Sequence, residues 1–171
     1  TQFQGDAILA IFNVPFEDEQ HAQLAFDAAT DLLEMVQNKT FAGEDLAIRV
    51  GINTGPLIAG NVGGGGRQTY TVHGDAVNLA ARLEGQSKNY GVGIVIGEET
   101  EAKVDNVFAT LELDLIAVKG KAEAVRIHTI LGREDMLQQQ DFLALKKQHT
   151  AMLEAYRTQD WSKARGLIKD C

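Results

Sequence analysis

The sequence predicts a mixed α/β layer fold, an α+β sandwich, followed by a small helical hairpin. Strand-like and helix-like segments alternate along residues 1–131, which is typical of layered folds. Beyond this region the strand signals stop and two helix-forming segments follow. The chain has 171 residues, 44% of them hydrophobic, so it is long enough to bury a core. We therefore expect one domain over residues 1–131 and a helical appendage over residues 132–171.

The first half of the chain is expected to form a strand, a helix and a hairpin. The uncapped apolar run Ala7–Phe12 fits a buried strand. Apolar residues three and four positions apart place one stripe on a helix over residues 19–38. Residues 46–53 alternate in polarity with period two, as a strand does. A turn at Thr54–Pro56 leads into Leu57–Val62, which we expect to pair with residues 46–53 as a hairpin.

The second half is expected to contain two helices, three strands and the helical tail. Residues 63–67 are glycine-rich and fit a flexible loop, and Asp75 fits the N-cap of a helix over residues 76–86. We expect strands at residues 91–96, 109–118 and 124–131, and a short helix at residues 98–104. In the tail, one helical face contains Phe142, Leu145, His149, Met152 and Tyr156, and a second helix starts near Trp161.

The composition excludes several classes of protein. The 16 basic and 24 acidic residues give a net charge of −8, so no bulk attraction to a nucleic acid polymer or an anionic lipid is expected. The one cysteine, Cys171, excludes an internal disulfide framework. No signal peptide is visible, and the apolar run Ala7–Phe12 is far shorter than a membrane span. We expect a cytoplasmic protein, or the cytoplasmic part of a membrane-tethered one.

One predicted helix carries a pair of residues suited to an anionic ligand. Asn78 and Arg82 are four positions apart and therefore project from the same side of the helix. A guanidinium binds phosphate oxygens, and an amide can bind a sugar hydroxyl of the same ligand. The spacing alone favours a plainer alternative, in which Asn78 is a core polar group and Arg82 a surface charge.

Five segments of the sequence, taken together, support the interpretation that Asn78 and Arg82 bind an anionic ligand. They are Gly5-Asp6, Arg49–Gly55, Gly60–Gly63, Tyr70–Glu84 and Val118–Lys121. In this order they resemble the class III nucleotidyl cyclase catalytic domain, the family of adenylate and guanylate cyclases. The resemblance covers about residues 1–131. It implies the ferredoxin-like cyclase fold, in which helices flank a mostly antiparallel sheet.

The resemblance implies a phosphoryl transfer with named residues. In such cyclases the ribose 3′-hydroxyl attacks the α-phosphorus of a nucleoside triphosphate, and two metal ions stabilise the attacking and leaving oxygens. Asp6 matches one of the family's two metal-binding aspartates, for Mg²⁺ or Mn²⁺. Asn78 matches the residue that orients the ribose, Arg82 the residue that stabilises the transferring phosphate, and Lys119 the residue that holds the terminal phosphates.

Two further residues fall where the family contacts the purine. Thr71 occupies a place often held by aspartate or threonine in adenylate cyclases. Gln2 stands where adenylate cyclases usually carry lysine and guanylate cyclases glutamate, and its amide is compatible with either base. Because of Thr71 we expect ATP as the substrate and 3′,5′-cyclic AMP as the product. A guanylate cyclase and a non-catalytic nucleotide-sensing or dimerisation module remain the alternatives.

The resemblance also implies a head-to-tail homodimer. In the family the metal aspartates come from one protomer, and the purine, ribose and phosphate contacts come from the other. A monomer is then inactive. The family's first metal aspartate lies on a strand that precedes every segment seen here, and no residue of this sequence matches it. We expect that strand, and a sensor domain upstream of it, in the full-length protein.

Overall fold

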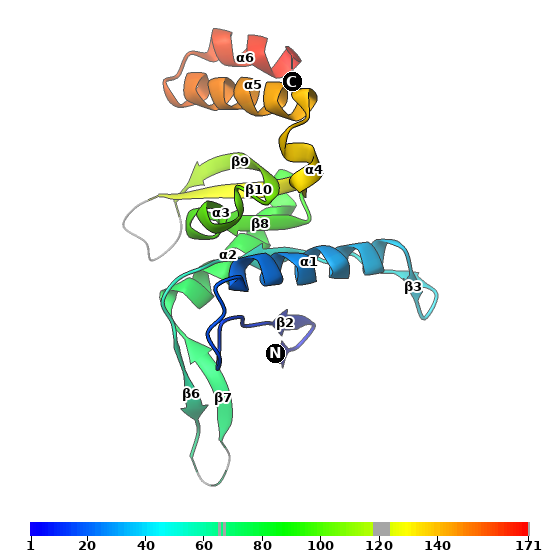
Figure 1. Cartoon of the computed structure of the whole chain (residues 1–171), viewed down its shortest axis with the longest axis vertical. Coiled ribbons are helices and arrows are strands. Elements are labelled where there is room, and N and C mark those ends of the chain that lie inside the picture. The colour runs from blue at the N-terminus through cyan, green and yellow to red at the C-terminus, as the bar shows by residue number, and fades with distance from the viewer. Residues whose placement is uncertain (65, 67, 118–123, 171) are drawn as a thin grey trace.

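A four-stranded sheet forms the centre of the computed structural model, which describes residues 1–64, 66, 68–117 and 124–170 (Figure 1). The strand order is β5 (Val50–Ile52), β8 (Ile94–Gly97), β10 (Val125–Arg133) and β9 (Phe108–Ile116). Strand β5 runs parallel to β8, and the β8–β10 and β10–β9 pairs are antiparallel. This mostly antiparallel sheet with helices around it confirms the predicted α+β fold.

Helices cover both faces of this sheet. Helix α2 (Asp75–Tyr90) packs on one face, and α1 (His21–Gln37) and α3 (Glu98–Val104) pack on the other. The fully buried strand β8 separates two apolar clusters, because successive side chains of a strand point to opposite faces. The cluster beside α2 contains Leu79, Leu83, Val95 and Ile127. The cluster beside α1 and α3 contains Ala22, Phe26, Ala29, Ile94, Ile96, Val104 and Phe108.

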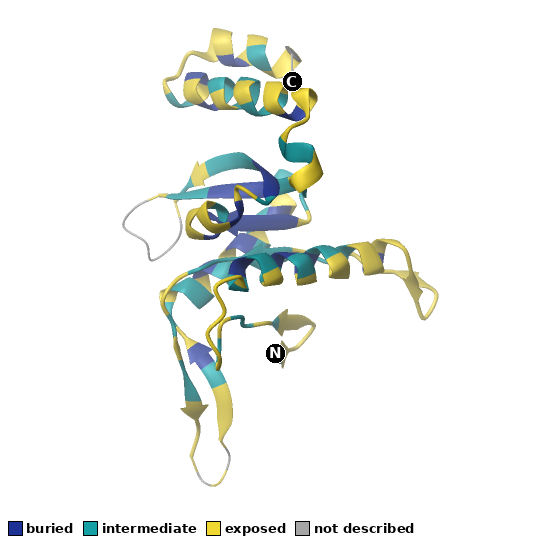
Figure 2. Ribbon diagram, in the orientation of Figure 1, coloured by how far each residue is buried: buried dark blue, intermediate teal, exposed yellow. Residues whose placement is uncertain are grey.

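Six short strands form three hairpins that are separate from the central sheet. They are β1 (Gln2–Gln4) with β2 (Ala7–Leu9), β3 (Thr40–Phe41) with β4 (Glu44–Asp45), and β6 (Ile58–Val62) with β7 (Thr69–His73). Figure 1 shows β6 and β7 projecting away from the sheet, at the end of the molecule opposite the C-terminal helices. Figure 2 shows that large parts of these hairpins are exposed.

Two strand predictions are wrong. The segment Ala7–Phe12 is not a buried strand, because β2 ends at Leu9, pairs only with β1 among the described strands, and leaves Ile8 53% exposed. Residues 46–62 do not form a hairpin, because β5 pairs with β8 and β6 pairs with β7. Beside the fully buried β8, the β5 residues Val50 and Ile52 pack against the apolar cluster under α1, whereas Ile58 of β6 is 78% exposed.

The predicted N-cap of helix α2 is also corrected. Helix α2 starts at Asp75, but its N-cap is Gly74, and no side chain caps it by a hydrogen bond. The φ of Gly74 is 156°, and a Cβ atom there would lie 3.1 Å from the carbonyl oxygen of Pro56. Both observations favour glycine at the cap. The carboxylate of Asp75 lies instead in the first turn, where the helix dipole favours an acid.

The predicted helical hairpin follows the sheet. It consists of α5 (Gln140–Arg157) and α6 (Trp161–Asp170), and a short helix α4 (Glu134–Leu137) precedes it. On the predicted face of α5, Phe142 is buried, whereas Tyr156 is exposed and packs edge-on against Trp161 with ring centroids 5.4 Å apart. In the described part of the chain, no helix is both long and apolar enough to span a membrane.

A charged junction joins the helical hairpin to strand β9. The carboxylate of Glu112 accepts hydrogen bonds from Arg126 at 2.7 Å and from Arg157 of α5. Nε2 of His149 lies 2.6 Å from the backbone carbonyl oxygen of Glu112. Because a carbonyl oxygen can only accept, Nε2 is the protonated ring nitrogen and donates this hydrogen bond. Burial pushes the pKa of Glu112 upward, but the hydrogen bonds from Arg157 and Arg126 outweigh it and hold the pKa below its usual 4.5.

We expect Glu112→Gln to lower the free energy of unfolding by about 1–3 kcal/mol at neutral pH, because two guanidinium groups lose their charged acceptor. A carboxyl group whose folded pKa is lowered stabilises the fold above its unfolded pKa, and this stabilisation is lost as the pH falls through the folded pKa. The difference between wild type and variant should therefore shrink below pH 4.5. Urea titrations from neutral to acid pH measure this difference in the free energy of unfolding. The control is Glu154→Gln, because Glu154 is an exposed residue of α5. A pH-independent difference would contradict the assignment.

Candidate active site

Helix α2 presents Asn78 and Arg82 on one exposed face. Its opposite face is buried through Leu79, Leu83 and Ser87. Asn78 is exposed, so the structure excludes the alternative in which it is a core polar group. Arg82 is exposed too, and within the described residues no acidic side chain forms an ion pair with it. An amide and an unpaired guanidinium on one face are suited to an anionic, hydroxyl-bearing ligand.

The position of α2 is set by a close approach to strand β5. A Cβ atom on Gly51 would lie 2.2 Å from the carbonyl oxygen of Ala80 and 2.3 Å from the backbone nitrogen of Glu84. Only glycine leaves room for the helix backbone at this distance. Arg49 forms an exposed ion pair with Glu84 at 2.7 Å beside this contact. The helix that carries Asn78 and Arg82 therefore lies directly against the edge strand of the sheet.

The structure brings Gln2 and Thr71 together although they are far apart in the sequence. The Thr71 hydroxyl donates a hydrogen bond to Oε1 of Gln2 at 3.2 Å. Nε2 of Gln2 donates to the carbonyl oxygen of Tyr70. These two bonds fix the orientation of the Gln2 amide, because one end must donate and the other must accept. One Nε2 hydrogen of Gln2 and the lone pairs of the Thr71 oxygen remain for a ligand.

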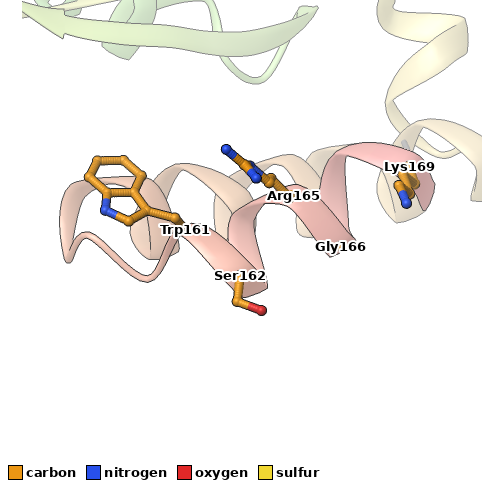
Figure 3. Close-up of a pocket in the computed structure, with 5 residues that line it drawn as sticks. All are labelled: Trp161, Ser162, Arg165, Gly166 and Lys169. Carbon is orange, nitrogen blue, oxygen red and sulfur yellow. The ribbon is translucent and has the colours of Figure 1, made fainter.

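A pocket lies beside this pair. It is lined by Thr1, Gln2, Ile11, Val14, Pro15 and Tyr70. Its walls are mainly apolar and one amide faces it, a combination suited to a flat ring with a polar edge. Another pocket lies on α6, and Figure 3 shows its lining. It is formed by Trp161, Ser162, Arg165, Gly166 and Lys169 and contains none of the site residues predicted from the sequence.

The two remaining candidate residues are Asp6, which the structure describes, and Lys119, which it does not. Asp6 is exposed in the tight turn between β1 and β2, after Gly5 with φ 67°. Its carboxylate is a hard oxygen ligand of the kind that Mg²⁺ and Mn²⁺ prefer. Among the described residues, no group of three or more histidine, cysteine or acidic side chains could hold a metal. Lys119 lies outside the described residues.

Two contributors to these contacts were not predicted from the sequence. The carbonyl oxygen of Tyr70 holds the Gln2 amide, and backbone acceptors leave no signal in a sequence. The side chain of Asn53 donates to the carbonyl oxygen of Ala76 in α2 at 3.1 Å. Asn53 lies within one of the segments that suggested the family, but nothing in the pattern indicated what it contacts.

Comparison with known proteins identifies the class. The model of the adenylate and guanylate cyclase catalytic domain matches residues 2–132. The chain therefore belongs to the class III family of adenylate and guanylate cyclase catalytic domains, as the five sequence segments predicted.

Individual relatives include cyclases of both base specificities. Adenylate cyclase 1 of Rhizobium meliloti is 32% identical over 136 residues, which cover 77% of this chain and 20% of that protein. The chain thus spans about a fifth of the length of this curated relative. Among solved structures, the guanylate cyclase domain of RhGC from Catenaria anguillulae, in complex with GTP, gives a TM-score of 0.65 at 35% identity, covering 71% of this chain and 65% of that one. The adenylyl cyclase CyaB of P. aeruginosa gives 0.60 at 32% identity, covering 76% and 69%.

Proposed function

We propose that this chain converts ATP to 3′,5′-cyclic AMP and pyrophosphate, with residues 1–131 as the catalytic domain and residues 132–171 as an appended helical unit. The observation that carries the proposal is the exposed pair Asn78 and Arg82 on one face of α2, with no described acidic partner for Arg82. The contact between Gln2 and Thr71 adds a candidate base-reading site. A sensor domain elsewhere in the full-length protein fits the greater length of the relative. Because the proposed reaction needs ATP, we expect the catalytic domain to lie in the cytoplasm.

The proposed chemistry assigns one task to each side chain. Asn78 binds the ribose and directs its 3′-hydroxyl toward the α-phosphorus. Arg82 stabilises the negative charge that builds on the phosphate in the transition state. Lys119 binds the terminal phosphates, and Asp6 would hold a divalent cation. Bound Mg²⁺ or Mn²⁺, two ions per site, would stabilise the charges on the attacking and leaving oxygens.

We further propose that two copies associate head to tail. Members of this family bind nucleotides and act as dimers. The hairpins of this chain expose large apolar side chains, which supports their burial by a second copy. These are Phe3, Ile8, Ile58, Val62 and Tyr70. In this arrangement Asp6 of one copy faces Thr71, Asn78, Arg82 and Lys119 of the other.

Product analysis of the full-length protein tests the proposed activity. With ATP and Mn²⁺ or Mg²⁺, we expect cyclic AMP and pyrophosphate in equal amounts, and no product after chelation of the metal. Binding of ATP without turnover would favour the non-catalytic nucleotide-sensing module. Turnover of GTP alone would assign the chain to the guanylate cyclases.

Base selectivity gives a separate prediction. Gln2 is uncharged and Thr71 contributes one hydroxyl, so we expect ATP to be preferred with measurable GTP turnover. A misplaced hydrogen-bond pair costs about 1–3 kcal/mol, which limits what two uncharged groups can discriminate. Gln2→Lys should sharpen the preference for ATP, measured as kcat/KM for both nucleotides.

The matched control for this change is Gln37→Lys, which adds the same charge at an exposed position at the end of α1. It should leave the ATP-to-GTP ratio unchanged. A wild-type preference for GTP, or no change of the ratio in Gln2→Lys, would show that Gln2 does not read the base.

A further inference from the structure

The side chain of Asn53 links the end of strand β5 to helix α2 near the proposed site. It directly follows strand β5, which ends at Ile52. Its Nδ2 donates a hydrogen bond to the carbonyl oxygen of Ala76 at 3.1 Å. Ala76 is the second residue of α2 and precedes Asn78 by two positions. The amide therefore ties the end of β5 to the turn of α2 from which Asn78 projects.

The packing around this hydrogen bond is close at two glycines, Gly97 beside the Asn53 amide and Gly55 beside Ala76. A Cβ atom on Gly97, at the junction of β8 and α3, would lie 2.4 Å from Oδ1 of Asn53. A Cβ atom on Gly55 would lie 2.8 Å from Cβ of Ala76. Asn53 itself is only partly exposed. A side chain packed this tightly has little freedom to reorient, so its hydrogen bond fixes where the first turn of α2 lies.

Close packing at Gly55 also holds the first turn of α2, and other described contacts hold the rest of the helix. Gly51 permits the close approach of β5 near Ala80, in the middle of the helix. At the far end, the hydroxyl of Tyr90 donates to Asp114 of β9 at 2.9 Å. Among the described side-chain hydrogen bonds, the one from Asn53 is the one that reaches the first turn.

We propose that Asn53 is a positioning residue, which sets the placement of Asn78 and Arg82 on α2 without contacting the nucleotide. The inference rests on the proposed function, because it assumes that these two residues act on the substrate. Without the hydrogen bond, the first turn of α2 loses one of the contacts that hold it, and a shift of this turn displaces Asn78 directly and Arg82, one turn further on, to a smaller extent. A misplacement of about 1 Å in such a site costs about a hundredfold in rate.

Asn53→Asp in the full-length protein tests the inference. The carboxylate has nearly the same size, but it cannot donate and it puts an acceptor opposite the Ala76 carbonyl oxygen. We expect kcat to fall by about tenfold to a hundredfold, with KM changed less than about threefold. The matched control is Arg49→Gln, which breaks the exposed ion pair between Arg49, the residue before β5, and Glu84 of α2, and should leave kcat within about twofold of wild type.

A double-mutant cycle separates positioning from a general loss of folded enzyme. If Asn53 acts through Arg82, Asn53→Asp should lower kcat by a smaller factor in the Arg82→Ala background than in the wild type. The same factor in both backgrounds would show a merely structural role and would overturn the inference. Should Asn53→Asp fail to fold, Asn53→Ala answers the same question.

The two possible failures are distinguishable. Wild-type kcat in the folded Asn53→Asp variant would overturn the positioning role and leave the proposed cyclase activity intact. A wild-type protein that makes no cyclic nucleotide would overturn the proposed function itself.

Discussion

Arg82→Ala is expected to lower kcat by about tenfold to a thousandfold, the scale of one preorganised charge-stabilising group. The value of KM should change little, because the guanidinium matters most when negative charge builds on the phosphate in the transition state. The structure favours a specific effect. Arg82 is exposed and forms no ion pair within the described chain, so its removal breaks no packing and leaves no buried charge.

Arg165→Ala is the matched control, because Arg165 is an exposed arginine on α6, a helix that lies at one end of the molecule and away from α2 (Figure 1). It should retain wild-type kcat. Asn78→Ala should behave like Arg82→Ala while circular dichroism shows an unchanged fold. An unchanged kcat with a raised KM would reduce Arg82 to a contact of the ground state.

The sequence predicted the helices better than the strand pairs. Helices α1 and α3 and the C-terminal hairpin lie close to their predicted ranges, because helical periodicity is a local property. Strand partners depend on contacts that the local pattern does not contain. Residues 50–52 pair with β8, about forty positions away, and not with the segment that follows them. The exposed Ile58 on β6 also shows that an apolar run does not identify which strands are buried.

In the candidate site, too, the features within one helix could be predicted from the sequence, and the contacts between elements could not. The common face of Asn78 and Arg82 follows from their spacing on one helix. The contact between Gln2 and Thr71 depends on how β1 lies against β7, which periodicity does not encode. The link from Asn53 to Ala76 likewise exists only after β5 and α2 have packed together.

The shared site predicts that two inactive variants restore each other. Asp6→Ala removes a metal ligand, and Arg82→Ala removes the charge-stabilising group that the other copy contributes. A mixed dimer of the two variants has one cleft with both defects and one with none. Random exchange makes about half of all dimers mixed, so about a quarter of the clefts become intact.

Cyclic AMP formation by this mixture, measured before and after subunit exchange, tests the central claim most directly. Each variant alone should retain at most about a tenth of the wild-type activity, and the exchanged mixture should recover about a quarter of the wild-type activity per subunit. Exchange itself is followed with differently labelled subunits. A mixture in which mixed dimers have formed but which remains as inactive as its parents would contradict an active site built from two copies of this chain.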